Sequence, residues 1–387
     1  MLGTVGRQVR VAVNRRIFAL LLGAHEEAGP ALQPTELGAP VLHLRELVGE
    51  APHAPTAILA DASGVYFGTA AVGVVRPGAE ALRTRDVRGD RDRLALGCDP
   101  KACYFVAGGG RLYRLAAGAR SAAPVDLGSE RALWVANDPG GDLVALRATE
   151  GQRTVQLCLF QDGRFVPRRL PELSVPSGDP YVTFARFSPD GDLWVGLSHR
   201  GEDGELTNDG IGVQKTSGEG VYYRPSAEKK RGKNKDGGLP LPEEVRGAAF
   251  APGATWLATL GGLVRISGGE ADWISRDEAP VGDICSDVVI DKQGTVWAAS
   301  PDGLCRYEDG KWEAMDKDGP LERGASALQV DRDGTLLVGT QSGVFRWDGS
   351  LGARIDGTVG EGVLDLEMDR QGRLWVLTMD GYSIHPR

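Results

Sequence analysis

The chain has 387 residues, 55 glycines, 41% hydrophobic residues and a formal net charge of -9. An acidic surface repels phosphate backbones, so nucleic acid is excluded as an expected partner. No apolar run approaches the roughly 18 residues that a membrane-spanning helix needs, so we expect no membrane span.

Residues 1–38 form an N-terminal segment without a clear pattern. Four arginines precede an apolar run over residues 17–24, which is typical of a signal peptide, although a strand or helix packed on the rest is the alternative. The five cysteines are odd in number and scattered, and this favours a reducing compartment. We therefore expect a cytoplasmic protein, or a periplasmic one if residues 1–24 are removed. Cys98 and Cys103 face each other across a turn, and we expect both to be reduced.

From residue 56 onward one pattern recurs along the chain. An apolar run ends in Asp, a turn closes at Gly, and two further strand-length runs follow, as in the stretches from Ser286 to Gly310 and from Ser326 to Gly349. A unit of this kind is a small antiparallel meander that has to stack on copies of itself, and its spacing of about 40 residues is typical of a four-stranded propeller blade. Eight copies begin near Thr56, Leu94, Ala132, Thr183, Arg246, Ser286, Ser326 and Val363.

The last copy contains only three strands, and the strand-like run Val41–Leu47 precedes the first copy. We predict that Val41–Leu47 completes the last blade and closes the ring. The predicted fold is all-β: a single β-propeller of four-stranded antiparallel blades over residues 39–387. Eight blades are favoured, and seven result if two copies merge or one is degenerate.

Two residue types recur at fixed places in the copies. Aromatic rings at the second strand are predicted to wedge between neighbouring blades: Tyr66, Phe105, Trp194, Trp256, Trp297 and Trp375. The aspartates of the first turn are predicted to hold their own turns by side-chain to backbone hydrogen bonds: Asp190, Asp291, Asp331 and Asp369.

The repeat resembles that of the two-component regulator propellers, which are WD40/NHL-like. The resemblance rests on Asp-x-x-Gly-x-Leu-Trp-Val-Gly-Thr followed by Gly-Leu/Val-x-Arg-Tyr/Trp, best seen in residues 291–307, 331–347 and 369–382. It implies a propeller. Members of that family are often sensor ectodomains joined to a membrane helix and a kinase, and since neither pattern occurs here, we do not expect the sensor role to carry over.

The fourth copy departs from the repeat through two inserts, residues 199–210 and 225–244. In a meander, the turns between second and third strands and the links between blades emerge on the same face, so both inserts are predicted to lie on one loop-rich face. The basic run over residues 229–235 is either a docking site for an acidic partner or a solvated loop. The acidic insert lacks the spacing of a calcium loop, so no metal is expected.

We therefore predict a non-enzymatic, monomeric scaffold that binds a protein partner through this face, within a regulatory or signalling assembly, with a small ligand in the central channel as a further option and no cofactor. The predicted partner-binding residues are His199, Arg200, Asp203, Glu205, Asp209, Lys229, Lys230, Arg231, Lys233, Lys235, Asp302, Gln341 and Asp380. No catalytic motif is recognisable. The alternatives are a propeller lyase or lactonase-like hydrolase with a metal at the channel, drawing on His199, Asp302 and Asp380, or a periplasmic sensor module.

Overall fold

The computed structural model describes seven strands before residue 83 and most of the chain from residue 95 to 385. The described ranges are 3–5, 8–13, 16–21, 55–61, 64–69, 73–75, 80–82, and 95–385 apart from gaps at 108–109, 118, 120–121, 169–172, 202–204, 226–243, 275–277, 279–281, 283, 316–318, 356–357, 359–361 and 379–380. Within these ranges no helix has the length and apolar character required to cross a bilayer.

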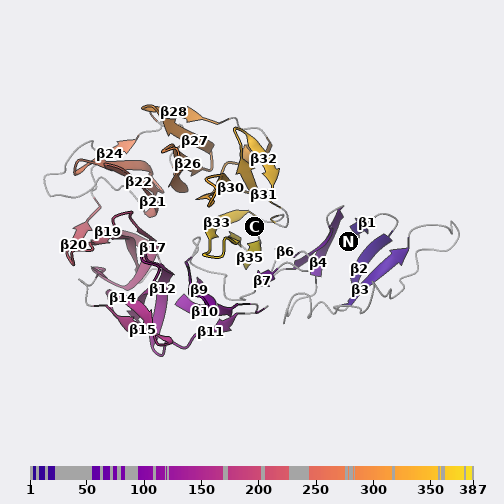
Figure 1. The fold of residues 1–387 in the computed structure, drawn as a ribbon, viewed down its shortest axis with the longest axis horizontal. Coiled ribbons are helices and arrows are strands. Elements are labelled where there is room, and N and C mark those ends of the chain that lie inside the picture. The colour runs from indigo at the N-terminus through magenta and orange to yellow at the C-terminus, as the bar shows by residue number, and fades with distance from the viewer. Residues whose placement is uncertain are drawn as a thin grey trace.

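Seven four-stranded antiparallel sheets surround a central axis (Figure 1). We number these blades 1 to 7 in chain order. The first strands of neighbouring blades contact one another, which places the first strand of each blade innermost. Blades 2 to 7 begin at the predicted copies from Ala132 to Val363, and blade 1 begins at the copy near Leu94.

The strands of blades 1 to 4 are β8 (Leu96–Cys98), β9 (Ala102–Ala107), β10 (Arg111–Ala116) and β11 (Ala123–Pro124); β12 (Glu130–Asn137), β13 (Leu143–Thr149), β14 (Thr154–Gln161) and β15 (Arg164–Pro167), with β16 (Leu173–Ser174) added against β14; β17 (Asp179–Phe187), β18 (Leu193–Arg200), β19 (Leu206–Gln214) and β20 (Gly220–Tyr223); β21 (Val245–Ala251), β22 (Ala254–Thr259), β23 (Gly262–Ser267) and β24 (Glu270–Ile274).

The strands of blades 5 to 7 are β25 (Asp287–Ile290), β26 (Val296–Ser300), β27 (Gly303–Glu308) and β28 (Lys311–Ala314); β29 (Ala327–Val330), β30 (Leu336–Thr340), β31 (Gly343–Trp347) and β32 (Leu351–Arg354); β33 (Val363–Met368), β34 (Leu374–Thr378), β35 (Gly381–His385) and, from the start of the chain, β7 (Glu80–Leu82). A short 3-10 turn, η3 (Gly319–Leu321), precedes blade 6.

Strand β7 closes the ring by pairing antiparallel with β35, with Tyr382 opposite Leu82 and Ile384 opposite Glu80. Closure by a strand from the N-terminal part of the chain is therefore confirmed. The strand itself is a correction, because Glu80–Leu82 occupies the place predicted for Val41–Leu47. The run Val41–Leu47 lies outside the described residues.

The copy near Thr56 is not a blade, and the count is therefore seven rather than the favoured eight. Its three strands form a separate sheet that pairs with none of the seven blades among the described strands (Figure 1). The strand that would have been its fourth, β7, is donated to blade 7. These strands are β4 (Pro55–Asp61), β5 (Gly64–Thr69) and β6 (Gly73–Val75), and a further three-stranded sheet consists of β1 (Gly3–Val5), β2 (Gln8–Val13) and β3 (Arg16–Leu21). The predicted domain boundary at residue 38 stays a prediction.

Aromatic rings fill the spaces between blades, as predicted for Phe105 and the four tryptophans; Tyr66 lies where side chains are not described. One ring pair spans each of six interfaces, with centroid distances of 5.1 Å for Tyr104–Phe160, 5.9 Å for Trp134–Phe187, 5.7 Å for Trp194–Phe250, 5.2 Å for Trp256–Tyr307, 5.4 Å for Trp297–Trp347 and 5.6 Å for Phe105–Trp375. Aliphatic side chains, including Leu337 and Val376, fill the interface between blades 6 and 7.

The aspartates of the first turn hold their own turns in blades 5 to 7, as predicted. In blade 7, the Asp369 Oδ1 accepts hydrogen bonds from the backbone N–H groups of Gln371 and Arg373, each at 2.9 Å, and its Oδ2 accepts one from the Trp375 indole at 2.9 Å. The same indole bond is made in blade 5, from Trp297 to Asp291 at 2.8 Å, so in blades 5 and 7 the turn is tied to the ring that wedges the next interface. Blade 3 is a correction: the side chain of Ser188, not that of Asp190, accepts the backbone N–H of the turn, from Asp192 at 3.1 Å.

Cys98 and Cys103 are joined by a disulfide, which corrects the expectation that they are reduced. They lie opposite each other in the β8–β9 pair with a Cα–Cα distance of 4.0 Å. The other three cysteines, Cys158, Cys285 and Cys305, are buried thiols that form no disulfide. Burial raises the pKa of Cys305, so this thiol is inert.

Two truncations test ring closure by β7. A chain that starts at residue 76 lacks β1 to β6 but keeps β7, whereas a chain that starts at residue 84 also loses β7. We expect the second to be less stable than the first by about 1–3 kcal/mol and more prone to aggregate, because it loses three cross-strand pairs and leaves the edge of β35 open. Urea unfolding measures the difference, and equal stability of the two chains would show that β7 does not latch the ring.

A pair of substitutions tests the turn aspartates. Asp369→Ala leaves the buried indole of Trp375 and two backbone donors without an acceptor, so we expect a loss of roughly 2–4 kcal/mol in unfolding free energy. Asp331 also holds two backbone N–H groups of its turn, but its second oxygen pairs with the half-exposed Arg346 instead of an indole. For Asp331→Ala we therefore expect a smaller loss of unfolding free energy, about 1–2 kcal/mol. Equal losses in chemical denaturation would contradict a special role for the indole bond.

Candidate functional site

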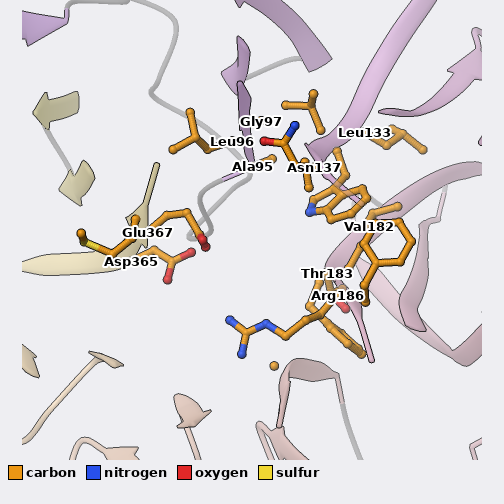
Figure 2. A pocket seen from close by; sticks show the side chains of 18 of the residues that line it. Ala95, Leu96, Gly97, Leu133, Asn137, Val182, Thr183, Arg186, Asp365 and Glu367 are labelled. Atoms are coloured by element: carbon orange, nitrogen blue, oxygen red, sulfur yellow. The ribbon is translucent and has the colours of Figure 1, made fainter. Parts of the chain in front are cut away.

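A cavity of about 470 Å³ lies on the propeller axis (Figure 2). It is lined mainly by the first strands of the blades, which lie innermost in the ring. The lining residues that carry charge are Arg186, Glu244, Arg246, Asp287, Arg332, Asp365, Glu367, Asp369 and Arg370.

Four of these charges lie on strand positions that face the middle of the channel. Arg186 and Glu367 stand two residues before the first turn of blades 3 and 7, and Asp287 and Asp365 stand four residues before it in blades 5 and 7. Figure 2 shows Arg186 reaching into the cavity from β17, and Asp365 and Glu367 from β33. Three carboxyl groups therefore share the middle of the channel with one guanidinium.

The hydrogen bonds of these groups fix their positions. Asp287 accepts the backbone N–H of Val288 and that of Leu328 in the next blade, each at 2.9 Å, so its carboxylate also joins blades 5 and 6. Arg186 donates to the carbonyl oxygen of Ala248 in blade 4 at 2.9 Å. Both side chains are thus held by bonds across blade interfaces, and the site depends on the ring.

Among the channel acids, the carboxyl group of Glu367 has a clearly shifted pKa. Its side chain is half-buried and lines the cavity. Desolvation by the surrounding protein, with Asp365 and Asp287 nearby, raises its pKa to about 7, although Arg186 works in the opposite direction. Near neutral pH the group is therefore about half protonated. A perturbed acid inside a cavity is the kind of group that marks a binding site.

Charged side chains also line the two ends of the channel. At one end Arg246 and Glu244 form an ion pair at 3.0 Å. At the other, Arg332 donates to the carbonyl oxygen of Asp369 at 3.3 Å. Arg370 lines the same end, which therefore carries two arginines.

One group of residues in the described part of the chain has metal-ligand spacing: Cys98, Cys103 and Asp369. Its two sulfurs are joined in the disulfide, and the Asp369 carboxylate already accepts bonds from Arg373 and Trp375. This donor set does not fit a metal ion.

The structure brings together two of the predicted partner-binding residues. His199 and Asp209 are both buried, and the Nδ1 of His199 lies 2.9 Å from Oδ2 of Asp209. The range 199–210 is less of a loop than predicted, because β18 runs to Arg200 and β19 begins at Leu206. The insert therefore extends two paired strands, and these strands carry His199, Arg200 and Asp209.

The other predicted site residues lie on different blades or outside the described part. Asp302 and Gln341 are exposed in the turns between second and third strands of blades 5 and 6. Arg200 and Glu205 lie at the ends of the extended hairpin in blade 3. Outside the described residues lie Asp203, Lys229, Lys230, Arg231, Lys233, Lys235 and Asp380.

Contacts in three blades agree with the predicted arrangement of the loop-rich face. Asp302 lies against Gly282 in the link before blade 5, where an added β-carbon would be 2.1 Å from its carboxylate. Gln341 lies against Gly362 in the link before blade 7, where an added β-carbon would be 2.5 Å from its amide. In blade 3 the link residue Ser177 bonds to His199. Links and turns between second and third strands thus share one face in these blades.

The sequence reasoning missed the channel residues. Their signal was a charge inside a run that is otherwise apolar, as with Glu367 in Val-Leu-Asp-Leu-Glu-Met over residues 363–368. In a strand that is buried on both sides such a charge is costly unless it faces a polar cavity.

No family model matches the chain, and no curated protein matches it. Among solved structures, the chain is similar to the extracellular domain of the hybrid two-component system BT3049 of B. thetaiotaomicron, with a TM-score of 0.55 and 12% identity over 100% of this chain and 51% of that one. The chain thus spans about half the length of that domain.

Two further solved structures resemble the chain. The WD40 β-propeller domain of Doa1 has a TM-score of 0.52 and 14% identity over 77% of this chain and 92% of that one. Virginiamycin B lyase from Staphylococcus aureus has a TM-score of 0.48 and 11% identity over 76% and 94%. At these identities the likeness concerns the fold alone. The chain is a seven-bladed β-propeller with repeats that resemble those of two-component regulator propellers.

Proposed function

We propose that this chain is a binding propeller whose central channel takes a small ligand that carries an ammonium group. The observation that supports the proposal is the set of three carboxyl groups, from Asp287, Asp365 and Glu367, in the lining of a cavity of about 470 Å³, where five carboxyl groups in all stand against four arginines. A cavity of this volume is within the usual range for small-molecule sites.

The state of Glu367 supports a cationic ligand in particular. Its pKa is raised to about 7 because the carboxylate is desolvated and has acidic neighbours. A bound ammonium group would stabilise the ionised form and so lower this pKa. Binding would then release a proton from Glu367, and the affinity would rise with pH.

The loop-rich face remains our proposed docking surface for a protein partner. Its support is the length of the connection between β20 and β21, which leaves Tyr223 and returns at Val245, together with the basic run that this connection carries. Long connections on a rigid scaffold commonly carry function. We likewise propose that the protein is monomeric, that it belongs to a regulatory assembly, and that it is cytoplasmic or periplasmic.

Ligand binding in the channel is tested by titrating putrescine, spermidine, choline and tyramine into the protein by calorimetry at pH 6 and pH 8. We expect at least one of these amines to bind roughly tenfold more tightly at pH 8, because Glu367, with its pKa near 7, is mostly protonated at pH 6. In Glu367→Gln the affinity should be weaker and should not change with pH.

Glu313→Gln is the matched control, because Glu313 is exposed on the outer strand β28 and pairs with Arg306 on the surface. This variant should keep both the affinity and its pH dependence. Absence of binding by every amine at both pH values, or an unchanged pH dependence in Glu367→Gln, would refute the proposed ligand class.

The docking surface is tested by replacing all five cations of the basic run with serine: Lys229, Lys230, Arg231, Lys233 and Lys235. We expect the folded variant to capture a partner from native lysate at least about tenfold less well than the wild type, and we expect wild-type capture to weaken as salt is raised. Equal capture by both proteins would show that the run is a solvated loop.

A further inference from the structure

Three side chains on the loop-rich face of blade 3 form a continuous chain of hydrogen bonds. The Oγ of Ser177 lies 2.7 Å from Nε2 of His199, and the Nδ1 of the same ring lies 2.9 Å and 3.0 Å from the two carboxylate oxygens of Asp209. A carboxylate accepts at Nδ1, so the neutral ring carries its proton there and Nε2 is the acceptor for the serine hydroxyl. Serine, histidine and aspartate stand in the order and at the distances that activate a serine nucleophile.

The serine of this chain of bonds is exposed to solvent, and the histidine and aspartate behind it are buried. Ser177 is exposed, whereas His199 is 8% and Asp209 is 6% exposed. The hydroxyl is therefore accessible from solvent, and the carboxylate that orients the imidazole is shielded from it. If the bond to Ser177 served only to satisfy the buried His199, the serine would not need to face the solvent.

The segment that carries Ser177 is anchored on both sides. Arg153 donates to the carbonyl oxygen of Pro176 at 2.8 Å, and Arg131 donates to that of Pro180 at 2.9 Å. Gly178 has a φ of +60°, and a β-carbon there would lie 2.3 Å from the carbonyl oxygen of Arg200. The nucleophile is thus held in place on a short link between two prolines.

Asp209 is positioned by a β-bulge. The register of β18 against β19 shifts between Leu197, opposite Gly210, and Ser198, opposite Asn208, so that Asp209 is the extra residue. Its carbonyl oxygen accepts the Tyr222 hydroxyl at 2.7 Å, and burial raises the pKa of this tyrosine to about 12, which keeps the hydroxyl protonated as a donor. Bulges of this kind re-aim side chains next to active sites.

From this geometry we propose that Ser177, His199 and Asp209 form an acyl-transfer site that hydrolyses carboxylic esters. The Ser177 oxygen attacks the carbonyl carbon of the ester while its proton passes to Nε2 of His199, and Asp209 stabilises the imidazolium. The tetrahedral intermediate then collapses, the bond to the alcohol oxygen breaks, and the alcohol leaves with the proton from Nε2. A water molecule, deprotonated by the same nitrogen, releases the carboxylic acid and restores the serine.

The position of the site indicates which esters it would reach. Ser177 lies on the open surface of the loop-rich face, outside the lining of the central cavity. An ester group exposed on a larger molecule, or a small activated ester, can approach it without entering the channel. The proposed activity is therefore independent of ligand binding at Glu367, and either can fail without the other.

The experiment is covalent labelling of the full-length protein with a fluorophosphonate, which reacts with activated serines, followed by peptide mass spectrometry. We expect one adduct, at Ser177, and no adduct in Ser177→Ala. His199→Gln should abolish labelling, and Asp209→Asn should slow it at least about tenfold, because the ring is then no longer held in the productive tautomer. Hydrolysis of p-nitrophenyl acetate should fall in parallel in all three variants.

Ser174→Ala is the matched control, because Ser174 is also exposed and lies three residues earlier on the same segment. It should label and hydrolyse like the wild type. Circular dichroism and unfolding of Ser177→Ala and Asp209→Asn should match the wild type, so that lost labelling is not lost folding. Absence of labelling of the folded wild-type protein, or labelling that persists in His199→Gln, would overturn the proposal and leave the three residues as a structural network.

Discussion

The closed ring depends on the contact between its first and last blades. A four-stranded sheet with apolar side chains on both faces is unstable alone, and each blade covers the faces of two neighbours. The series has no free end because blades 1 and 7 share one apolar cluster, in which Phe105 of blade 1 packs on Trp375 of blade 7 at 5.6 Å between ring centroids, and because β7 completes blade 7. The indole of Trp375 is in turn bonded to Asp369, so one turn aspartate positions the ring that joins the two ends of the repeat.

The repeat could be predicted from sequence because its signals are local. An aspartate turn such as the one at Asp369 makes its bonds within six residues, and the alternation of apolar residues within each strand is equally short-ranged. The closing strand could not be predicted in this way. Glu80–Leu82 is only three residues long, and its partner in β35 lies about 300 residues away in sequence, so the pairing is decided by the geometry of the ring. The copy near Thr56 has the local pattern of a blade and still is not one, because its fourth strand is used elsewhere.

The candidate sites were predictable to different degrees. His199 and Asp209 could be placed on the loop-rich face, because the alternation of connections in a meander requires it. Ser177 could not, since it precedes His199 by 22 residues in an inter-blade link whose sequence has no motif, and only the fold brings the two side chains together. The channel residues were missed for a related reason. Which alternate position of a first strand faces the axis depends on register, and bulges shift that register in several blades, as between Val182 and Phe184.

Both sites meet on one strand, β17, the innermost strand of blade 3. Near its start Pro180 pairs with His199, and near its end Arg186 points into the channel. Blade 3 is also where the repeat is most altered, since Ser188 stands in place of the turn aspartate and the hairpin of β18 and β19 is extended. Blade 4 also lacks a turn aspartate, with Pro252 and Gly253 in its first turn, whereas blades 1, 2, 5, 6 and 7 keep the aspartate turn. Because regular blades are sufficient for closure, one blade can depart from the pattern without loss of the fold, and in this chain the departures coincide with polar groups that packing alone does not require.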